Sequence, residues 1–470
     1  MRRTLRDQAR EKIETGRDRV DRIDEGGMKT GLRAAARDIV VTLQAAGYEA
    51  FFVGGCVRDF LRDVEPGDYD IVTSARPGDV QGLFPHTVPV GARFGVILVL
   101  EGGRGYEVAT YRTEDGYDDG RRPSRVQFAT AREDVQRRDF TVNGLLLDPV
   151  TGDVTDLVGG REDLARRIIR TIGDPEQRFA EDRLRMLRAV RFAAVLDFEI
   201  DPDTFAAVRR HAPAIRQISA ERVRDELNRI FTSNGARRGL ELLDGSGLLV
   251  EILPEVTALK GVEQPEQFHP EGDVWQHVLQ MLGHLPVAAD GTPDPCLSWA
   301  VLLHDVGKPS TRFADCAGIH FYGHVRKGEE MAAAILQRLK FSRAWTETIL
   351  ALIRGHMMFM HVRDMRPGRL KRFLRQPDFD LHLELHRLDC LGSHGMLDNY
   401  SFCKEKLTEI AAEELHPPPL LTGDDLIAGG YAPGPLFKEM LHAVEEAQLN
   451  GEIRTKEEAE RFVGKRFRVH

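Results

Sequence analysis

The hydrophobic pattern of this chain changes at about residue 160, and that change limits the folds it can adopt. Before it, an amphipathic segment at residues 32–47 predicts a helix that stops at Gly47. Short apolar runs then predict strands in "EAFFVGG", "YDIVTS", "GVILVL" and "YEVATYR", and glycines separate several of them. After residue 160, helical periodicity continues to the end of the chain. We therefore expect an α+β fold, with a sheet-containing head followed by helical domains.

A length of 470 residues is too great for a single compact core, so several domains are expected. Segments rich in proline and glycine at residues 260–273 and 416–425 predict a linker and a further boundary. The expected division is a charged N-terminal extension at 1–30, a head at 31–160, a helical neck and body at 161–262, a second helical domain at 263–415 and a helical tail at 416–470.

Composition favours a cytoplasmic protein with no membrane partner. No apolar run approaches the roughly 20 residues that span a bilayer, and the charged start lacks the apolar stretch of a signal peptide. Five scattered cysteines without a CxxC pair predict reduced thiols. The net charge of −9 argues mildly against a nucleic-acid partner. However, arginines gather in "RFAEDRLRMLRAVRFAA", and local charge decides phosphate binding.

Two carboxylates stand one residue apart in "GGCVRDFLRDVEPGDYDIVTS". On a strand, Asp68 and Asp70 would point to the same face. Two like charges so close repel each other, and a hard divalent ion such as Mg²⁺ relieves that repulsion. Taken alone, "EPGDYD" fits a solvated turn better than a metal site.

Three further features favour the metal site. Gly54 and Gly55 allow backbone N–H groups to approach a phosphate closely. Glu107 lies in a strand otherwise suited to burial, where a lone carboxylate is costly. "RRDFTVN" places Arg138 and Asp139 just before an expected helix. Together these residues predict metal-dependent phosphoryl or nucleotidyl transfer.

Five ordered motifs, "GGCVRDFLRD…DYD", "YEVATYR", "RRDFTVNGLLLD", "DLVGGREDL" and "EDRLRMLRAVRFAA", resemble those of class II tRNA nucleotidyltransferases. That family includes the CCA-adding enzymes and the bacterial poly(A) polymerases. The resemblance covers roughly residues 48–255. It implies a polymerase-β-like head with a mixed or antiparallel sheet, followed by helical neck and body domains. It also implies template-independent addition of CCA, from CTP and ATP, to tRNA 3′ ends, with no DNA partner.

The same resemblance implies roles for individual residues. Asp68, Asp70 and Glu107 would be the catalytic carboxylates, with Asp68 and Asp70 binding Mg²⁺ in a two-metal site. The residues expected to bind the incoming nucleotide are Gly54, Gly55, Arg58, Arg138, Asp139, Asn143, Asp182, Arg185, Arg188 and Arg191.

"EDRLR" would be the part of the site that reads the base. If a helix runs through the motif, Asp182 and Arg185 share one face at i and i+3. A carboxylate accepts from the exocyclic amine of cytosine or adenine, whereas uracil and guanine offer a carbonyl there, so they would be rejected. Glu181 is expected to orient the arginine. Arg188 and Arg191 would reach the triphosphate, or pair with acidic neighbours instead.

Residues 112–126, "RTEDGYDDGRRPSRV", resemble the flexible loop that family members need for adding the terminal A. An A-adding enzyme or a poly(A) polymerase would keep the same loop, so both remain alternatives to CCA addition. In the tail, "TGDDL" and "GPLF" fit helix caps better than tRNA contacts.

The second helical domain carries histidines and aspartates in the order H…HD…H…H…D. This order, centred on "CLSWAVLLHDVGKPS", resembles the HD metal-dependent phosphohydrolases. The resemblance implies that a divalent transition metal or Mg²⁺ is bound by His277, His304, Asp305 and Asp389. His324 and His356 would bind a second metal or the phosphate. The implied activity is that of a 2′,3′-cyclic phosphodiesterase or phosphatase on RNA ends. A less favoured alternative is an HD hydrolase whose head only binds RNA.

Overall fold

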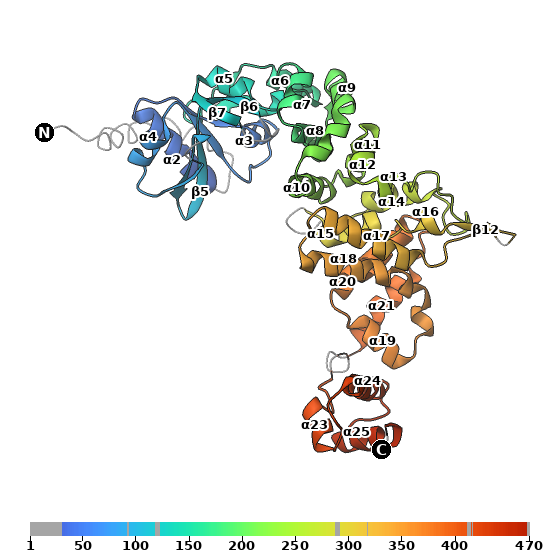
Figure 1. Cartoon of the computed structure of the whole chain (residues 1–470). Coiled ribbons are helices and arrows are strands. Elements are labelled where there is room, and N and C mark those ends of the chain that lie inside the picture. Colours follow the sequence, from blue (N-terminus) through green and yellow to red (C-terminus); the bar gives the residue numbers. More distant parts are fainter. Residues whose placement is uncertain are drawn as a thin grey trace. The chain divides into compact units, whose positions relative to one another are not determined.

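The structure is a computed structural model that describes residues 31–91, 94–117, 123–286, 292–316, 318–410, 415 and 417–467 (Figure 1). The expected N-terminal extension at 1–30 and the centre of the 112–126 loop lie outside the described residues. The chain divides into two compact units. One comprises Met1–Ile230 with Arg238–Ile252, and the other comprises Phe231–Arg237 with Leu253–His470.

A mixed seven-stranded sheet forms the head, with strand order β3-β4-β5-β2-β1-β8-β9. Its strands are β1 (Ala50–Val53), β2 (Asp70–Thr73), β3 (Thr87–Gly91), β4 (Val96–Glu101), β5 (Arg104–Thr110), β8 (Leu145–Leu147) and β9 (Val154–Asp156). β1 is antiparallel to β2 and β8, whereas β2 is parallel to β5. The expected strands in the first 110 residues are confirmed. Residues 112–126, expected as a loop, belong largely to a hairpin of β6 (Arg112–Tyr117) and β7 (Pro123–Phe128).

Apolar side chains of the central strands form the main core of the head with two helices. These are α2 (Gly31–Ala45) and α4 (Pro77–Leu83). α2 ends where predicted, because Gly47 adopts a positive φ of 93° and the Tyr48 N–H bonds back to the Leu43 carbonyl at 3.1 Å. The remaining short helices of the head are α3 (Gly55–Phe60), α5 (Ala131–Gln136), η2 (Thr141–Asn143) and α6 (Gly160–Arg166).

Two expectations about helices were wrong. No helix follows "RRD": η2 is a single 3₁₀ turn, because Leu145–Leu147 pairs with β1 and β9 and buries all three leucines in the sheet. The helix expected through "FAEDRLRMLRAVRFAAVL" is two helices, α7 (Pro175–Glu181) and α8 (Leu184–Leu196). They separate at Asp182, whose backbone is extended and whose carboxylate accepts from the Leu184 N–H at 3.0 Å. A capping aspartate satisfies an otherwise unpaired donor at the start of α8.

The rest of the first unit is helical, as expected. The two-residue strands β10 (Ile168–Ile169) and β11 (Glu199–Ile200) form a parallel pair beside these helices. The helices that follow are α9 (Pro202–His211), η3 (Ala212–Gln217), α10 (Ala220–Phe231), α11 (Ala236–Gly245) and α12 (Leu248–Ile252).

In the second unit, helix α15 (Pro295–Leu303) is buried from Leu297 to Leu303, which matches its uniformly apolar sequence. It contacts α14 (Val274–Gly283), α18 (Arg343–Gly355) and α20 (Phe379–Leu391). The other elements are α13 (Pro254–Thr257), α16 (Lys308–Thr311), β12 (Phe313–Asp315), β13 (Gly318–His320), α17 (His324–Arg338), η4 (His356–Asp364), α19 (Pro367–Leu374), α21 (Asp398–Glu409), α23 (Gly423–Ala428), α24 (Pro435–Leu449) and α25 (Lys456–Arg466).

"TGDDL" forms a helix cap, as expected. Thr422 and Asp425 make a reciprocal capping box at the start of α23. Within the described ranges, no helix has both the length and the apolar character needed to cross a bilayer.

Candidate active sites

Gly54, Asp70 and Arg138 converge where β1 meets α3. Val53 pairs with Asp70 across β1 and β2, so Gly54 follows directly beside that carboxylate. Gly54 has a φ of 78°, and a Cβ there would lie 3.6 Å from Asp70 Oδ2 and 3.9 Å from Arg138 Nη1. Glycine therefore both adopts this backbone conformation and keeps the space beside the carboxylate open.

Asp70 belongs to a group of three acidic residues. The pairing of Ile71 with Val108 places Asp70 beside Glu107 on the opposite face of the sheet from those buried residues. The side chain of Asp70 keeps access to solvent, but neighbouring protein atoms displace part of the water around it. The carboxylates of Asp68 and Glu107 add repulsion, so the pKa of Asp70 rises to about 6. Asp68, just before β2, completes the group.

Two expectations about the acidic group need correction. Only Asp70 lies on the strand, because β2 begins there, and Asp68 precedes it. Glu107 is not buried: it occupies an exposed position of β5, between the buried Tyr106 and Val108. The described residues do contain triplets of candidate ligand atoms within 4.8 Å of one another, but none of these triplets includes a head carboxylate.

The predicted nucleotide-binding residues around Asp139 form one hydrogen-bonded network. Arg58 Nη1 donates to Asn143 Oδ1 at 2.9 Å, and Asn143 Nδ2 donates to Asp139 Oδ1 at 3.2 Å. Arg188 donates to Asp139 Oδ2 through Nε at 2.8 Å and Nη2 at 2.6 Å. Although burial opposes ionisation of Asp139, Arg188 and the other donors lower its pKa to about 2. Asp139 is thus already bound to protein groups, and it links η2 to α8.

Arg185 is held at the junction of α7 and α8. Its guanidinium donates to Glu181 Oε2 at 2.7 Å, to the Arg178 carbonyl at 3.1 Å and to the Arg137 carbonyl at 3.0 Å. The contact expected between Glu181 and Arg185 is therefore present. Asp182 is the first of the two residues between the helices, and its backbone carbonyl accepts from the Arg185 N–H at 3.0 Å. The two expected base-reading residues are neighbours although no single helix carries both.

Arg191 lies 2.7 Å from Glu226, an acidic neighbour on α10. Both Arg188 and Arg191 therefore have acidic partners, and their expected contact with the triphosphate stays a prediction.

The second unit gathers the predicted HD residues at the ends of four helices and on the face of α20. His277 lies on α14 and Asp389 on α20. His304 and Asp305 follow the buried helix α15, and His324 and His356 begin α17 and η4. Two groups bring their ligand atoms within 4.8 Å of one another: His277 with His304 and Asp305, and Asp305 with His324 and His356.

Each of these imidazoles is held through its Nδ1 atom. Nδ1 of His304, His324 and His356 lies 2.9, 2.8 and 2.6 Å from the carbonyl oxygens of Val301, Phe321 and Ile353. A carbonyl oxygen only accepts, so Nδ1 carries the proton and Nε2 keeps a free lone pair. His277 Nδ1 meets Glu271 Oε1 at 2.9 Å and the Gly392 carbonyl at 3.2 Å, so it too carries a proton on Nδ1. Although burial opposes the charge, Asp389 and Glu271 raise the pKa of His277 to about 9, so a metal ion would displace the proton on Nε2.

Buried atoms without hydrogen-bond partners mark the centre of the site. They are Nε2 of His277, His304 and His324, and Oδ1 of Asp305. His277 Nε2 lies 3.2 Å from Asp389 Oδ1, but without hydrogen-bond geometry. Burial lowers the pKa of His356 to about 4, so its imidazole stays neutral. Neutral imidazoles and ionised carboxylates that face one another fit a divalent metal ion.

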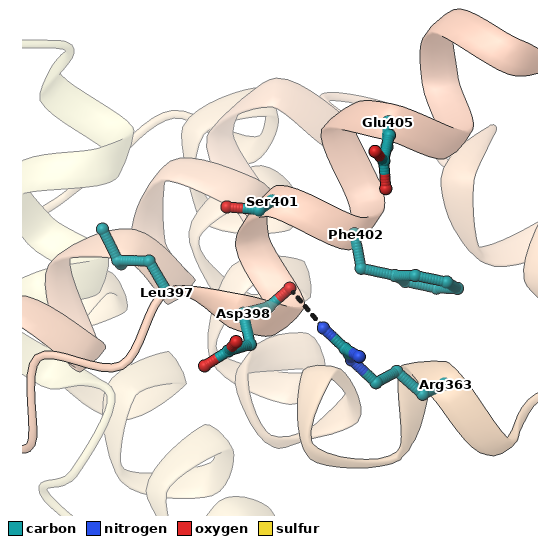
Figure 2. Close-up of a pocket in the computed structure, with 6 residues that line it drawn as sticks. All are labelled: Arg363, Leu397, Asp398, Ser401, Phe402 and Glu405. Carbon is teal, nitrogen blue, oxygen red and sulfur yellow. Dashed lines mark hydrogen bonds between the residues drawn. The ribbon is translucent and has the colours of Figure 1, made fainter.

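A cavity of about 770 Å³ opens above these residues. One wall comes from the start of α21, which Arg363 ties to η4. Figure 2 shows the guanidinium donating to the Asp398 carbonyl (3.0 Å) beside Phe402. Arg363 Nε also donates to Asn399 Oδ1 at 3.1 Å. Asp398 and Asn399 both line the cavity.

Three family models match the chain in order. They are the poly A polymerase head domain at residues 50–170, the probable RNA and SrmB-binding site of polymerase A at 197–260, and the HD domain at 274–378. The chain is 46% identical over 214 residues to a CCA-adding enzyme of Limosilactobacillus reuteri. That match covers 45% of this chain and 53% of the relative, so the chain spans about half the length of this curated relative.

Solved structures extend the match over nearly the whole chain. The Bacillus stearothermophilus CCA-adding enzyme in complex with CTP is 30% identical, with a TM-score of 0.71, over 94% of this chain and 98% of that one. The chain belongs to the tRNA nucleotidyltransferase family of the CCA-adding enzymes. The Thermotoga maritima CCA-adding enzyme complexed with tRNA, 19% identical, covers 94% of this chain and 97% of its own with a TM-score of 0.59, and it shares the fold. The expected family, fold class and HD domain are confirmed.

Within this family framework, the structure adds positioning residues that the sequence reasoning missed. Buried Asp134 accepts from Arg137 at 2.6 Å and from Arg138 at 3.1 Å. Arg222 donates to both oxygens of Asp182, at 3.3 and 3.1 Å. The acidic start of α5 was a local signal for Asp134, whereas Arg222 is 40 residues from its partner and no local pattern marks it.

Missed residues of the HD centre include Lys308 and Glu271. Lys308 Nζ lies 2.7 Å from Asp305 Oδ2 and donates to Gln264 at 2.6 Å. Glu271 and Gln264 belong to residues 260–273, which were expected to be only a linker. This segment instead supplies side chains that support the metal-ligand candidates.

Proposed function

We propose that this protein adds the CCA sequence to tRNA 3′ ends from CTP and ATP, by metal-dependent nucleotidyl transfer in the head. The convergence of Gly54, Asp70 and Arg138 carries the proposal. Gly54 leaves space beside the strand, the carboxylates supply excess negative charge, and Arg138 supplies a cation. A nucleoside triphosphate with its Mg²⁺ would need these groups together. The raised pKa of Asp70 fits this reading, because a divalent cation would relieve the same repulsion.

In this mechanism Asp68 and Asp70 would hold Mg²⁺, with Glu107 as the third carboxylate. The bound ions would lower the pKa of the attacking 3′ hydroxyl and neutralise the pyrophosphate that leaves. Arg138, fixed by Asp134, would bind a phosphate of the nucleotide. Arg58 and Arg188 would complete that side of the site, since Asn143 and Asp139 hold both guanidinium groups in place.

Asp182 and Arg185 would select the base. The guanidinium of Arg185 is fixed by one carboxylate and two carbonyls, so it is positioned before a nucleotide binds. An Asp182 carboxylate beside it would accept from the amine of cytosine or adenine. A carbonyl in that place would face the carboxylate as acceptor against acceptor, and such mispaired polar groups give strong discrimination.

The proposal is tested with purified full-length protein and a tRNA that ends at the discriminator base, incubated with each nucleotide singly and with CTP and ATP together. We expect two cytidines with CTP alone and a complete CCA end with both. A long ladder of adenosines without use of CTP would identify a poly(A) polymerase instead. Addition of A only to a tRNA that already ends in CC would identify an A-adding enzyme.

A second activity is favoured by the buried Nε2 atoms of the HD domain. We propose that this domain binds a divalent transition metal or Mg²⁺ through His277, His304, Asp305 and Asp389. His324 and His356 would serve a second ion or the phosphate. The metal would activate a water molecule as nucleophile. The substrate would be an RNA 3′ end carrying a 2′,3′-cyclic phosphate or a phosphate, and its removal would free the end for nucleotide addition.

Paired variants separate the two activities. Asp68→Ala with Asp70→Ala should abolish nucleotide addition and leave the removal of terminal phosphate intact, whereas His304→Ala should do the reverse. If the double variant in the head retained every activity, the head would be an RNA-binding module only. The five free thiols support a cytoplasmic location for both proposed activities.

A further inference from the structure

An aromatic side chain stands at the mouth of the HD cavity with one face open. Tyr322 lines this cavity and is 75% exposed, the highest value for a large apolar side chain among the described residues. Leaving an aromatic ring in water forgoes a large gain from burial. The contacts of the ring therefore indicate what this exposed position is for.

The ring of Tyr322 is held in place on its other side. It stacks on the imidazole of His320, with ring centroids 5.3 Å apart and planes 15° from parallel. His320 Nε2 in turn lies 3.1 Å from Asp315 Oδ1 on the paired strand of the β12–β13 hairpin. The tyrosine is therefore the outer layer of a small stack that the hairpin supports.

This stack is tied to the candidate metal ligands by the turn that follows. Phe321 accepts hydrogen bonds from the backbone N–H of His324 at 3.2 Å and from its Nδ1 at 2.8 Å. Gly323, with a φ of 77°, closes the turn. Only Gly323 separates Tyr322 from His324, so their Cα atoms lie within about 7 Å of each other. The open ring face thus stands next to the site where a phosphate would bind.

Other apolar side chains surround the same opening. In the described part of the second unit, seven large apolar side chains are exposed, and four of them line this cavity: Phe268 at 53%, Tyr322, Met360 at 60% and Met396 at 58%. Methionine adapts its shape to flat rings. The floor, by contrast, holds imidazoles, carboxylates and Lys308.

We propose that Tyr322, backed by His320, is the nucleobase subsite of the HD centre, on which the 3′-terminal base of an RNA stacks while its phosphate occupies the metal site. The inference rests on the proposed phosphohydrolase function and names the part of the substrate that function leaves open. A charged floor beside an apolar rim fits a ligand that is anionic at one end and flat and apolar at the other. A nucleotide has that form, with one ribose between its base and its phosphate. Stacking accepts any base, since every base has a π face.

Two variants of similar size test the stacking face itself. Tyr322→Phe keeps the ring, whereas Tyr322→Leu keeps an apolar side chain and removes the flat face. Full-length, metal-loaded protein is assayed on 2′,3′-cyclic AMP and on 1-O-methylribose 2′,3′-cyclic phosphate, which lacks a base. We measure kcat/KM for cyclic AMP divided by kcat/KM for the base-free substrate. We expect Tyr322→Leu to lower this ratio about tenfold, mainly through a higher KM for cyclic AMP, and Tyr322→Phe to leave it unchanged. An unaltered ratio in Tyr322→Leu, or an equal loss in both variants, overturns the proposal.

Photocrosslinking tests the subsite without relying on turnover. An RNA ending in 4-thiouridine 3′-phosphate is irradiated with the full-length protein, and crosslinked peptides are mapped. We expect a crosslink at Tyr322 that persists in Tyr322→Phe and is lost in Tyr322→Leu. If neither the cyclic phosphates nor the RNA 3′-phosphate is hydrolysed but this crosslink forms, the hydrolase function fails and the subsite stands. Crosslinks confined to other residues overturn the subsite, even if hydrolysis is observed.

Discussion

Replacing Asp139 by asparagine should weaken the attachment of the sheet to α8. Asp139 is 8% exposed and accepts two hydrogen bonds from Arg188 on one oxygen, and bonds from the Phe140 N–H and Asn143 on the other. Burial alone would raise the pKa of this carboxyl. Arg188 and the other donors outweigh that effect and lower it from 3.8 to about 2.

The pKa shift sets the magnitude. Lowering the pKa from 3.8 to about 2 corresponds to roughly 2 kcal/mol. Because the pKa is lower in the folded state, this stabilisation is fully present above pH 3.8 and is lost as the pH falls towards 2. At pH 7 we therefore expect Asp139→Asn to lose about 2 kcal/mol. Part of that loss arises because Arg188 remains without its charged partner.

Hydrogen exchange in the full-length protein measures this effect locally. Opening free energies are taken from peptides that cover β8 and α8, for Asp139→Asn, Arg188→Met and the double variant. The double variant should be less destabilised than the sum of the single variants. Glu162→Gln is the control, because Glu162 pairs with Arg166 at the surface and should matter by less than about 0.5 kcal/mol. Additive effects, or a loss for Asp139→Asn no larger than that of the control, would refute the reasoning.

Three further substitutions test the two centres. Gly54→Ala would place an L residue at positive φ at a cost of about 1–2 kcal/mol, and should reduce CTP incorporation. Gly78→Ala, where the added Cβ meets no atom within 4 Å, should not. Glu271→Gln should weaken metal binding to the HD domain by about 10–100-fold, measured by metal titration, with exposed Glu263→Gln as control. Glu181→Gln removes the carboxylate that Arg178 and Arg185 share, and should lower the CTP-to-UTP ratio of kcat/KM about tenfold.

The sequence predicted those features that depend on residues close together in the chain. The helix at 32–47 formed as expected because its apolar residues recur at helical spacing. The strands that contain Asp70 and Glu107 formed as expected because their apolar residues supply the side chains that the sheet buries. The order of the HD residues likewise foretold which side chains cluster. In both cases the residue type at each position carries the information.

The rest depended on contacts between segments distant in sequence. Residues 181–185 continue a helical pattern, yet Asp182 leaves the helix to cap α8 and to bind Arg222. Glu107 was expected to be buried because its neighbours are, but the strand alternates and the opposite face of the sheet remains open there. A window of a few residues does not predict either outcome, since each is fixed by packing against other elements.

The two candidate centres differ in how their ligands are held, and that difference has a chemical consequence. Among the described residues, the head carboxylates are exposed and form no triplet of ligand atoms within 4.8 Å, so under the proposed function their arrangement would be completed by an ion and a nucleotide. In the HD domain, backbone carbonyls fix three imidazoles before any ion arrives. A site completed by its substrate suits a loosely held Mg²⁺ that accompanies each nucleotide. A preformed site of imidazoles suits an ion that stays bound between turnovers.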